Sequence, residues 1–192
     1  MENVELFNKY AHGEHWKKHP TFYAESFSNF LKDQNFKGTL VDAGCGNGRD
    51  AEVFVQRLPE AKVIGVDKDQ KEIEDDIICV PGATFMVENI EFLSFRDNQI
   101  GAYFMINVIH YLDQKKALAE IYRTLKPKGY LFVHFNLEIL GVNGELDYQQ
   151  DEKDIRRLIS FFEVVKEDRF ERFDTTPTKH THKILQLILQ KN

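Results

Sequence analysis

The sequence predicts an α/β protein built on a doubly wound, mostly parallel sheet. Strand-like and helix-like segments alternate between about residues 40 and 134, a pattern that builds parallel sheets with covering helices. A glycine-rich turn follows the first of these strands directly, which is typical of a ligand-binding strand–turn–helix unit. Two extended runs, 162–173 and 183–189, end the chain and predict an antiparallel hairpin at the sheet edge.

Each element is predicted from its own local pattern. Pro20 followed by Phe22, Phe27, Phe30 and Leu31 indicates a helix with one apolar face that stops near Gly38. The next elements are strands near Leu40, Val63, Phe85, Phe104 and Leu131, with helices over 51–58, 70–76 and 114–125. Residues 141–144 and 175–178 are loop-like, and the acidic run 151–154 favours a helix start before Ile155, Leu158 and Ile159.

The glycine turn is the strongest functional signal in the chain. Gly44, Gly46 and Gly48 stand on alternate positions after the apolar strand 39–43, and glycine lets a backbone approach a ligand closely. A phosphate-binding Walker loop is excluded because the turn does not end in Gly-Lys-Ser/Thr. A dinucleotide fingerprint fits poorly because Arg49 takes the place of its last Gly or Ala, which disfavours a nicotinamide oxidoreductase. A tight strand–helix junction without a ligand is the structural alternative.

A second acid follows at the distance expected for nucleoside binding. The β-rich run 61–66 ends in Asp67, and an acid at this place in open α/β sheets commonly accepts hydrogen bonds from ribose hydroxyls. Asp67 could also cap the next helix, and the two uses do not exclude each other.

The motifs together resemble those of the class I S-adenosylmethionine-dependent methyltransferases. Asp42 followed by the three alternate glycines resembles motif I of that family, and 83–90 resembles its third-strand segment. Leu125-Lys126-Pro127-Lys128-Gly129 matches its helix end before a strand, whereas Ile100-Gly101 departs from the usual Phe-Asp. The likeness runs from about Leu40 to His134 and implies a Rossmann-like sheet of seven strands, with the last reversed and inserted beside its neighbour.

The resemblance implies a cofactor, S-adenosylmethionine, with S-adenosylhomocysteine as product, and assigns residues to it. The cofactor-binding residues it implies are Asp42, Gly44, Gly46, Gly48, Asp67, Lys68, Asn89, Ile90 and Asn107. Asp67 would hold the ribose with Lys68 beside the adenine. Asn89 replaces the family's usual acid at the adenine edge, where its carbonyl oxygen can still accept a hydrogen bond, and Ile90 supplies the following N–H. The backbone of Asn107 would lie near the methionine part, although Asn107 could also be a turn residue.

Candidate acceptor residues come from the aromatic and histidine side chains. His110 and Tyr111 follow the fourth strand, where ligands of open sheets bind, and His110 is the better candidate base; a packing pair is the alternative. Tyr10, Trp16 and Tyr23 would form an aromatic lid, as in the family, and contact the acceptor. His180 and His182 share one strand face and could line the acceptor pocket, bind a metal or lie in a hairpin loop without a functional role.

We expect no metal among the site groups. The nearest sequence candidate is His12, His15 and His19 at helical spacing, which is more typical of a solvated helix face.

Composition restricts the partners. The chain has 192 residues and a net charge of −6, without a basic stripe, which argues against nucleic acid as the main partner. No apolar run approaches the ~20 residues of a membrane span, and two cysteines are too few for a disulfide framework. We therefore expect a cytoplasmic monomer or homodimer with one domain over 1–192, formed by a helical lid over 1–37 and a Rossmann-like core over 38–192.

The expected reaction is in-line transfer of a methyl group to a small or medium-sized molecule. Such a transfer depends mainly on alignment of the acceptor, so a general base is optional. The alternative is a non-catalytic cofactor-binding protein on the same scaffold, which Gly101 in place of the usual acid and the absence of an obvious base would favour.

Overall fold

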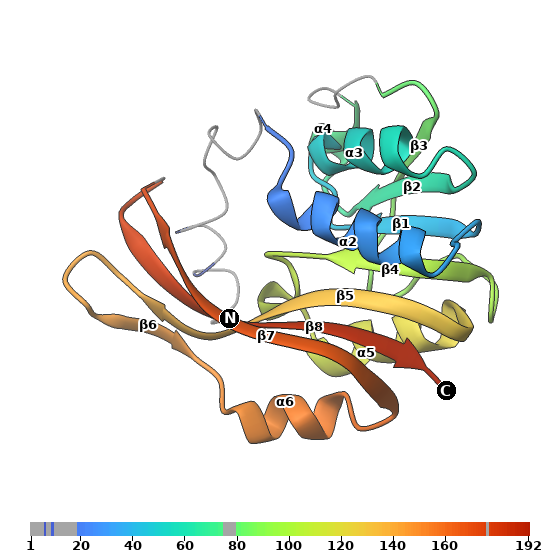
Figure 1. Cartoon of the computed structure of the whole chain (residues 1–192). Coiled ribbons are helices and arrows are strands. Elements are labelled where there is room, and N and C mark those ends of the chain that lie inside the picture. The colour runs from blue at the N-terminus through green and yellow to red at the C-terminus, as the bar shows by residue number, and fades with distance from the viewer. Residues whose placement is uncertain (1–5, 7–8, 10–18, 75–79, 176) are drawn as a thin grey trace.

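A computed structural model describes residues 6, 9, 19–74, 80–175 and 177–192 of the chain. The described strands form one sheet in the order β3-β2-β1-β4-β5-β8-β7, and β6 pairs with β5 beside this path (Figure 1). The strands are β1 (Thr39–Ala43), β2 (Lys62–Asp67), β3 (Ala83–Val87), β4 (Ile100–Met105), β5 (Leu125–Leu140), β6 (Leu146–Gln149), β7 (Phe162–Asp174) and β8 (His180–Lys191). The helical elements are α2 (Phe22–Asp33), α3 (Arg49–Arg57), α4 (Gln70–Glu74), the short 3-10 turn η2 (Ile109–Tyr111), α5 (Gln114–Thr124) and α6 (Glu152–Leu158).

The predicted α/β class and the mostly parallel sheet are confirmed. β3, β2, β1, β4 and β5 are parallel neighbours, whereas β8 runs antiparallel between β5 and β7. The reversed strand therefore sits inside the sheet and its hairpin partner β7 forms the edge, as expected.

The expected number of seven strands is wrong by one. Residues 141–144, which the sequence indicates as a loop, form a tight turn in which Gly144 adopts a φ of 77° and Gly141 donates its N–H to Glu145. The turn folds β6 back onto the end of the long strand β5. Strand β6 has only four residues and no clear apolar alternation, so its pattern does not distinguish it from a loop.

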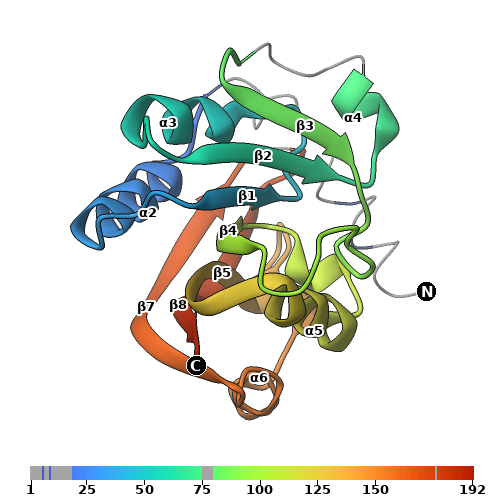
Figure 2. The ribbon, with the colours of Figure 1, turned by 90° about the vertical axis from the view of Figure 1, so that its right-hand side faces the viewer.

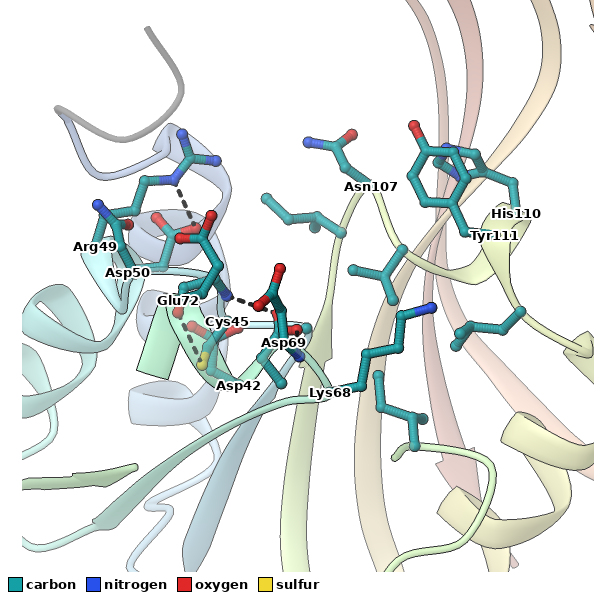
Figure 3. Close-up of a pocket in the computed structure, with 18 of the residues that line it drawn as sticks. Asp42, Cys45, Arg49, Asp50, Lys68, Asp69, Glu72, Asn107, His110 and Tyr111 are labelled. Carbon is teal, nitrogen blue, oxygen red and sulfur yellow. Dashed lines mark hydrogen bonds and ion pairs between the residues drawn. The ribbon is translucent and has the colours of Figure 1, made fainter. Parts of the chain in front are cut away.

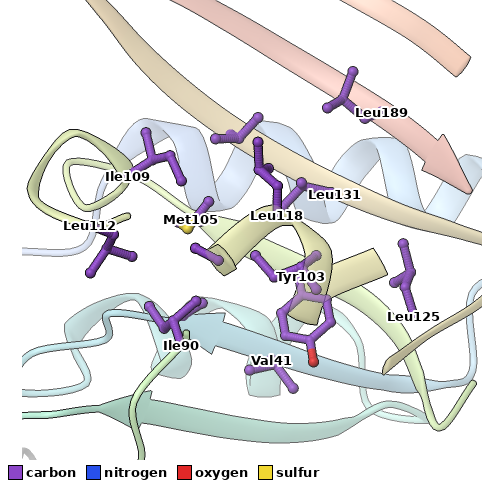
Figure 4. Packing of buried hydrophobic residues seen from close by; sticks show 14 of the residues in the cluster. Val41, Ile90, Tyr103, Met105, Ile109, Leu112, Leu118, Leu125, Leu131 and Leu189 are labelled. Atoms are coloured by element: carbon purple, nitrogen blue, oxygen red, sulfur yellow. The ribbon is translucent and has the colours of Figure 1, made fainter. Parts of the chain in front are cut away.

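Alternate residues of the central strands face two separate apolar clusters. On one face, Leu40, Phe104 and Phe132 pack with side chains of α2 and α3. On the other face, Val41, Tyr103, Met105 and Leu131 pack with side chains of α5 and α6 (Figures 2 and 4). Helices on both faces explain why the strands are apolar on both sides, and they make the sheet doubly wound.

The strand order reverses at β1, whose two neighbours are β2 and β4. In open α/β sheets, ligands bind at the carboxyl ends of the strands beside such a reversal. Asp42, Asp67 and Asn107 lie at or just beyond the carboxyl ends of these three strands. The topology therefore brings the sequence-predicted residues to one edge.

Gly101 has a packing role at the opposite edge of the sheet. It lies at the beginning of β4, and a Cβ atom there would come within 2.8 Å of the Phe36 ring and 3.3 Å of the Thr39 carbonyl oxygen. Close packing explains why glycine stands here instead of the acid usual in the family. Because Gly101 lies at the start of β4, this replacement removes no side chain from the edge where the strands end.

Among the described residues, no helix has both the length and the apolar character required of a membrane span.

Candidate cofactor and acceptor site

A cavity of about 540 Å³ opens at the carboxyl ends of β1, β2 and β4. Twelve of the sequence-predicted site residues line it: Asp42, Gly44, Gly46, Asp67, Lys68, Asn89, Ile90, Asn107, His110, Tyr111, His180 and His182. Tyr10 and Trp16 lie outside the described residues. Gly48 and Tyr23 do not line the cavity.

The glycine turn and the acid that follows β2 meet directly. The backbone N–H of Gly46 donates to Asp67 Oδ2 at 2.9 Å, and Gly44 donates to the Val66 carbonyl at 2.8 Å. Asp67 Oδ1 accepts from the N–H of Asp69 at 3.0 Å, so the carboxylate also starts the following turn. The turn and the carboxylate therefore form one preorganised unit at the cavity wall.

The three glycines serve different purposes. Each has a positive φ, of 79° at Gly44, 52° at Gly46 and 80° at Gly48, which disfavours any residue with a Cβ. At Gly44 an added Cβ would overlap the Val108 side chain, whereas at Gly46 it would meet nothing within 4 Å. Gly44 is thus required for packing, Gly46 keeps the cavity floor open, and Gly48 is the residue that precedes α3 rather than part of the cavity wall.

Asp42 carries a buried, unsatisfied carboxylate oxygen. Its side chain is almost fully buried, and Oδ2 has no hydrogen-bond partner among the described residues. Burial, together with the nearby charge of Asp50, raises the pKa of the Asp42 carboxyl well above its ordinary value. An unpaired buried carboxyl is costly, so this position suits a ligand that brings a cation or a hydrogen-bond donor.

Asn89 and Ile90 lie where β3 leaves the sheet, on the same side of the cavity as Lys68. Asn89 Oδ1 accepts from the N–H of Glu91 at 2.9 Å, so the predicted acceptor oxygen already has one local bond. A carbonyl oxygen has two lone pairs, and one remains for a ligand. Ile90 is 5% exposed and presents an apolar surface at the cavity wall.

Asn107 joins the end of β4 to the C-terminal hairpin. It adopts a positive φ of 58°, which asparagine tolerates better than most residues, and its Oδ1 accepts from Arg172 of β7 at 3.0 Å. Asn107 is therefore both a turn residue and part of the cavity lining.

His110 and Tyr111 form the wall opposite the glycine turn (Figure 3). Their rings lie 3.9 Å apart, and His110 Nδ1 lies 3.0 Å from Asn136 Nδ2. His110 Nε2 is buried without a hydrogen-bond partner among the described residues. Burial lowers the pKa of His110 well below 6.5, which keeps the ring neutral. Because the Asn136 amide N–H donates to Nδ1, the single proton of the neutral ring is on Nε2, which can donate a hydrogen bond but cannot accept a proton.

His180 and His182 converge on Asp174, a residue that the sequence did not single out. Asp174 Oδ2 lies 3.6 Å from His180 Nε2 and 3.2 Å from His182 Nε2, and it also accepts from Arg172 Nε at 3.0 Å. Burial lowers the pKa of His182, whereas hydrogen bonding to His182 and the Arg172 charge lower the pKa of Asp174 despite its burial. These four residues close the hairpin side of the cavity.

Tyr23 is not among the residues that line the cavity. Its ring stacks on Phe170 with centroids 5.6 Å apart and meets His134 edge to face at 4.5 Å. Burial raises the pKa of the Tyr23 hydroxyl against the opposing effect of Arg172. These contacts support the strands that carry the site, and the expected contact of Tyr23 with the acceptor stays a prediction.

Sequence reasoning missed Asp50, Arg172 and Asp174, which also line the cavity. Asp50 is 5% exposed and accepts the N–H of Thr21 at 2.6 Å, which fixes the start of α2 to the glycine turn. A charged residue inside the apolar pattern of α3 was the available signal for Asp50. Arg172 and Asp174 lie in a strand that also carries several exposed charged side chains, so nothing in the pattern set them apart.

Comparison with known proteins identifies the central part of the chain. Residues 41–133 match the family model described as "Methyltransferase domain". A trans-aconitate 2-methyltransferase of Azoarcus sp. is 29% identical over 96 residues, which are 50% of this chain and 38% of that protein. The chain spans between about a fifth and two fifths of the curated relatives it matches.

Solved structures share the fold over most of the chain. A protein from Methanosarcina mazei, described as a SAM-dependent methyltransferase, superposes with a TM-score of 0.65 at 20% identity, over 84% of this chain and 96% of that one. The [4+2]-cyclase SpnF superposes with a TM-score of 0.60 at 20% identity, over 75% of this chain and 60% of that one. At this identity the likeness shows the fold, which hosts more than one chemistry.

Proposed function

We propose that the chain is a class I S-adenosylmethionine-dependent methyltransferase that transfers a methyl group to a small or medium-sized molecule, because residues 41–133 match the family model of a methyltransferase domain. Bound S-adenosylmethionine would supply a methyl group on a sulfonium, which leaves readily in an in-line displacement. The chain's own task is then to hold the cofactor, align the acceptor and exclude water.

The observation that carries the proposal is the direct contact between the glycine turn and the Asp67 carboxylate. This contact holds an acid with two oxygens at the end of β2, where vicinal ribose hydroxyls would be recognised. Gly46 beside it has no side chain, and no atom lies within 4 Å of where one would begin, which leaves room for a ligand.

The charge of the cavity also fits this cofactor. Its lining contains seven acidic side chains, Asp42, Asp50, Asp67, Asp69, Glu72, Glu88 and Asp174, and three basic ones, Arg49, Lys68 and Arg172. S-adenosylmethionine carries a sulfonium and an ammonium group, and a negative cavity favours such a cation. We assign the unsatisfied oxygen of Asp42 to the ammonium end, because that group would satisfy it.

We assign the other cavity residues by the strand end at which each lies. Asn89, Ile90 and Lys68 would face the adenine from the end of β3, with Asn107 nearer the methionine part. His110 would donate a hydrogen bond to the acceptor through its unpartnered Nε2–H. The chain would form a single domain over 1–192, in a cytoplasmic monomer or homodimer. Of the segment 1–37 that was expected to form a lid, α2 instead packs with α3 and the sheet in the apolar core.

Calorimetric titration with S-adenosylhomocysteine tests the cofactor site. Asp67→Ala is expected to weaken binding by at least about 1.5 kcal/mol, because hydrogen bonds to a charged acceptor contribute that much or more. Asp33→Asn, which changes an exposed acid at the end of α2, is the control and should bind like the wild type. Absence of heat with the wild-type protein would refute the cofactor assignment, and unchanged affinity in Asp67→Ala would remove Asp67 from the site.

The fold also occurs in a protein described as a [4+2]-cyclase, so the fold alone does not establish methyl transfer. The second candidate is therefore a protein that binds the cofactor without transferring its methyl group. Incubation with methyl-labelled S-adenosylmethionine and a panel of small acids, phenols, thiols and amines separates the two. Label in an acceptor supports the enzyme, whereas tight cofactor binding with no label transferred to any of them favours the binding protein.

A further inference from the structure

The hairpin side of the cavity holds two imidazoles and a carboxylate in a convergent arrangement. His180 and His182 alternate on β8, so both rings project from one face of the strand, and Asp174 of β7 pairs with His180 in the sheet register. All three side chains are buried, and one donor atom from each lies within 4.8 Å of the others. The three residues line the cavity, so their donor atoms lie at its wall.

The second ring nitrogen of each histidine faces a carbonyl oxygen. His180 Nδ1 lies 2.7 Å from the Thr178 carbonyl oxygen, and His182 Nδ1 lies 3.0 Å from Asn136 Oδ1. Each Nδ1 must carry a proton to make these bonds, which leaves the Nε2 lone pairs directed at the Asp174 carboxylate. Metal-binding histidines are oriented in this way by carbonyl and carboxylate partners.

The spacing of the donor atoms agrees with coordination. Two bonds of about 2.1 Å at a tetrahedral angle place ligand atoms about 3.4 Å apart. The observed distances from Asp174 Oδ2 are 3.6 Å to His180 Nε2 and 3.2 Å to His182 Nε2. Without a cation or an added proton between them, two lone-pair acceptors would face each other at these distances.

We propose that Asp174, His180 and His182 form a binding site for a divalent transition-metal ion. A donor set of two imidazoles and one carboxylate suits Zn(II), Co(II) or Fe(II) and is poorly suited to Mg(II), which prefers oxygen ligands. Three protein ligands leave at least one coordination position open, as in catalytic zinc sites. An oxygen or sulfur atom of the acceptor could occupy it, a role that rests on the proposed function, whereas ion binding does not.

Arg172 competes with the ion. Its Nε donates to the same Asp174 Oδ2 at 3.0 Å, and its Nη1 donates to Asn107 Oδ1. A bound ion must share the carboxylate with this guanidinium, which lowers the expected affinity. The same contact yields a distinctive expectation, because removal of the Arg172 charge should strengthen metal binding.

The experiment is calorimetric titration of the full chain with Zn(II), together with Co(II) absorption spectroscopy, in the absence of S-adenosylmethionine. One tight equivalent is expected, with the visible absorption bands of nitrogen- and oxygen-coordinated Co(II). His180→Gln and His182→Gln should each weaken binding by more than about tenfold, the loss typical of residues that hold or orient a ligand. Arg172→Gln should bind more tightly than the wild type, and Mg(II) should not compete.

The N-terminal histidines provide the matched control. The variant with His12→Gln, His15→Gln and His19→Gln removes the other histidine cluster of the sequence and should keep the tight equivalent. Loss of binding in this variant, or wild-type affinity in His180→Gln and His182→Gln, would overturn the proposal, as would absence of a tight equivalent. Thermal unfolding of each variant shows that it is folded, and S-adenosylhomocysteine binding, measured separately, tests the cofactor site independently.

Discussion

At the scale of single residues, Gly44 is needed for packing of the fold, whereas Gly46 is needed to keep the cavity open. Both have positive φ values, so a Cβ adds backbone strain of about 1–2 kcal/mol at either position. Only at Gly44 does the added atom also overlap a neighbour, the side chain of Val108. Gly46 borders open space in the cavity.

We therefore expect opposite profiles for the two alanine variants. Gly44→Ala should lose more stability in urea unfolding than Gly46→Ala, and the added Val108→Ala change should recover part of that loss because it removes the overlap. Gly46→Ala should lose only about 1–2 kcal/mol of stability, the cost of the backbone strain, but bind S-adenosylhomocysteine much more weakly. Equal stability losses in the two variants would contradict the packing role of Gly44, and normal binding by Gly46→Ala would contradict the cofactor cradle.

At the scale of elements, Arg123 ties the segment between β3 and β4 to α5. Its Nη1 donates to the Phe95 carbonyl at 3.0 Å and to Asp97 at 2.7 Å, while its Nη2 donates to the Leu93 carbonyl at 3.0 Å and to Glu120 at 2.7 Å. Hydrogen bonds with Glu120 and Asp97 raise the Arg123 pKa, so the charge persists. One side chain thus anchors a segment with little regular structure of its own.

Arg123→Ala is expected to destabilise the protein by about 1–3 kcal/mol, because two backbone carbonyls lose their donors along with a charged network. Amide exchange should accelerate over residues 91–99 while the central strands remain protected. Arg157→Ala is the control, since its contact with Asp154 is an exposed pair that contributes about 1 kcal/mol or less. Equal effects of the two changes would mean that Arg123 does not anchor the segment.

The sequence was sufficient to predict the elements whose pattern is local. Apolar runs predicted the central strands, and Thr39–Ala43 has the bounds that the pattern indicated. The glycine turn and Asp67 were predicted to converge because parallel strands end at one edge, and their 2.9 Å hydrogen bond agrees. Strand β6 was not predicted, because it has only four residues and becomes a strand through backbone pairing with β5, which the local sequence pattern does not reveal.

At the scale of the whole molecule, the hairpin side of the site could not be predicted, because it depends on register between distant strands. Asp174 lies opposite His180 and Asn136 opposite Ile184 only once β8 is inserted between β5 and β7. A shift of one residue would turn each of these side chains to the other face of the sheet. His180 and His182 were recognisable as a pair on one strand face, but their partners were not.

The long strands also bury a histidine whose titration affects the stability of the whole chain. His134 of β5 is 2% exposed, and burial lowers its pKa to about 3. Its Nε2 pairs with Gln186 of β8, Tyr23 packs against the ring, and the charges of Arg172 and His182 act on it from the hairpin. The folded state therefore keeps this ring neutral at acidic pH.

In the unfolded chain the same residue titrates near its ordinary value of about 6.5. Between that value and about 3 the unfolded state binds a proton that the folded state does not. His134 therefore reduces the free energy of unfolding as the pH falls below 6.5, by up to about 1.4 kcal/mol per pH unit. The buried carboxyls Asp42 and Asp50 act in the opposite direction, because their raised pKa values let the folded state bind protons first.

Because these contributions oppose each other, the effect of His134 is measured as the difference in the pH dependence of the free energy of unfolding between the wild type and a variant without this histidine. His134→Gln removes the titration while leaving an amide that can pair with Gln186. Its free energy of unfolding, measured by urea denaturation between pH 7.5 and 5.5, should fall less with decreasing pH than that of the wild type, because only the wild type gains a proton at position 134 on unfolding. His19→Gln, which removes an exposed histidine, is the matched control. If wild type and His134→Gln show parallel pH dependences, the ring at position 134 is protonated in the folded protein, and burial does not hold it neutral.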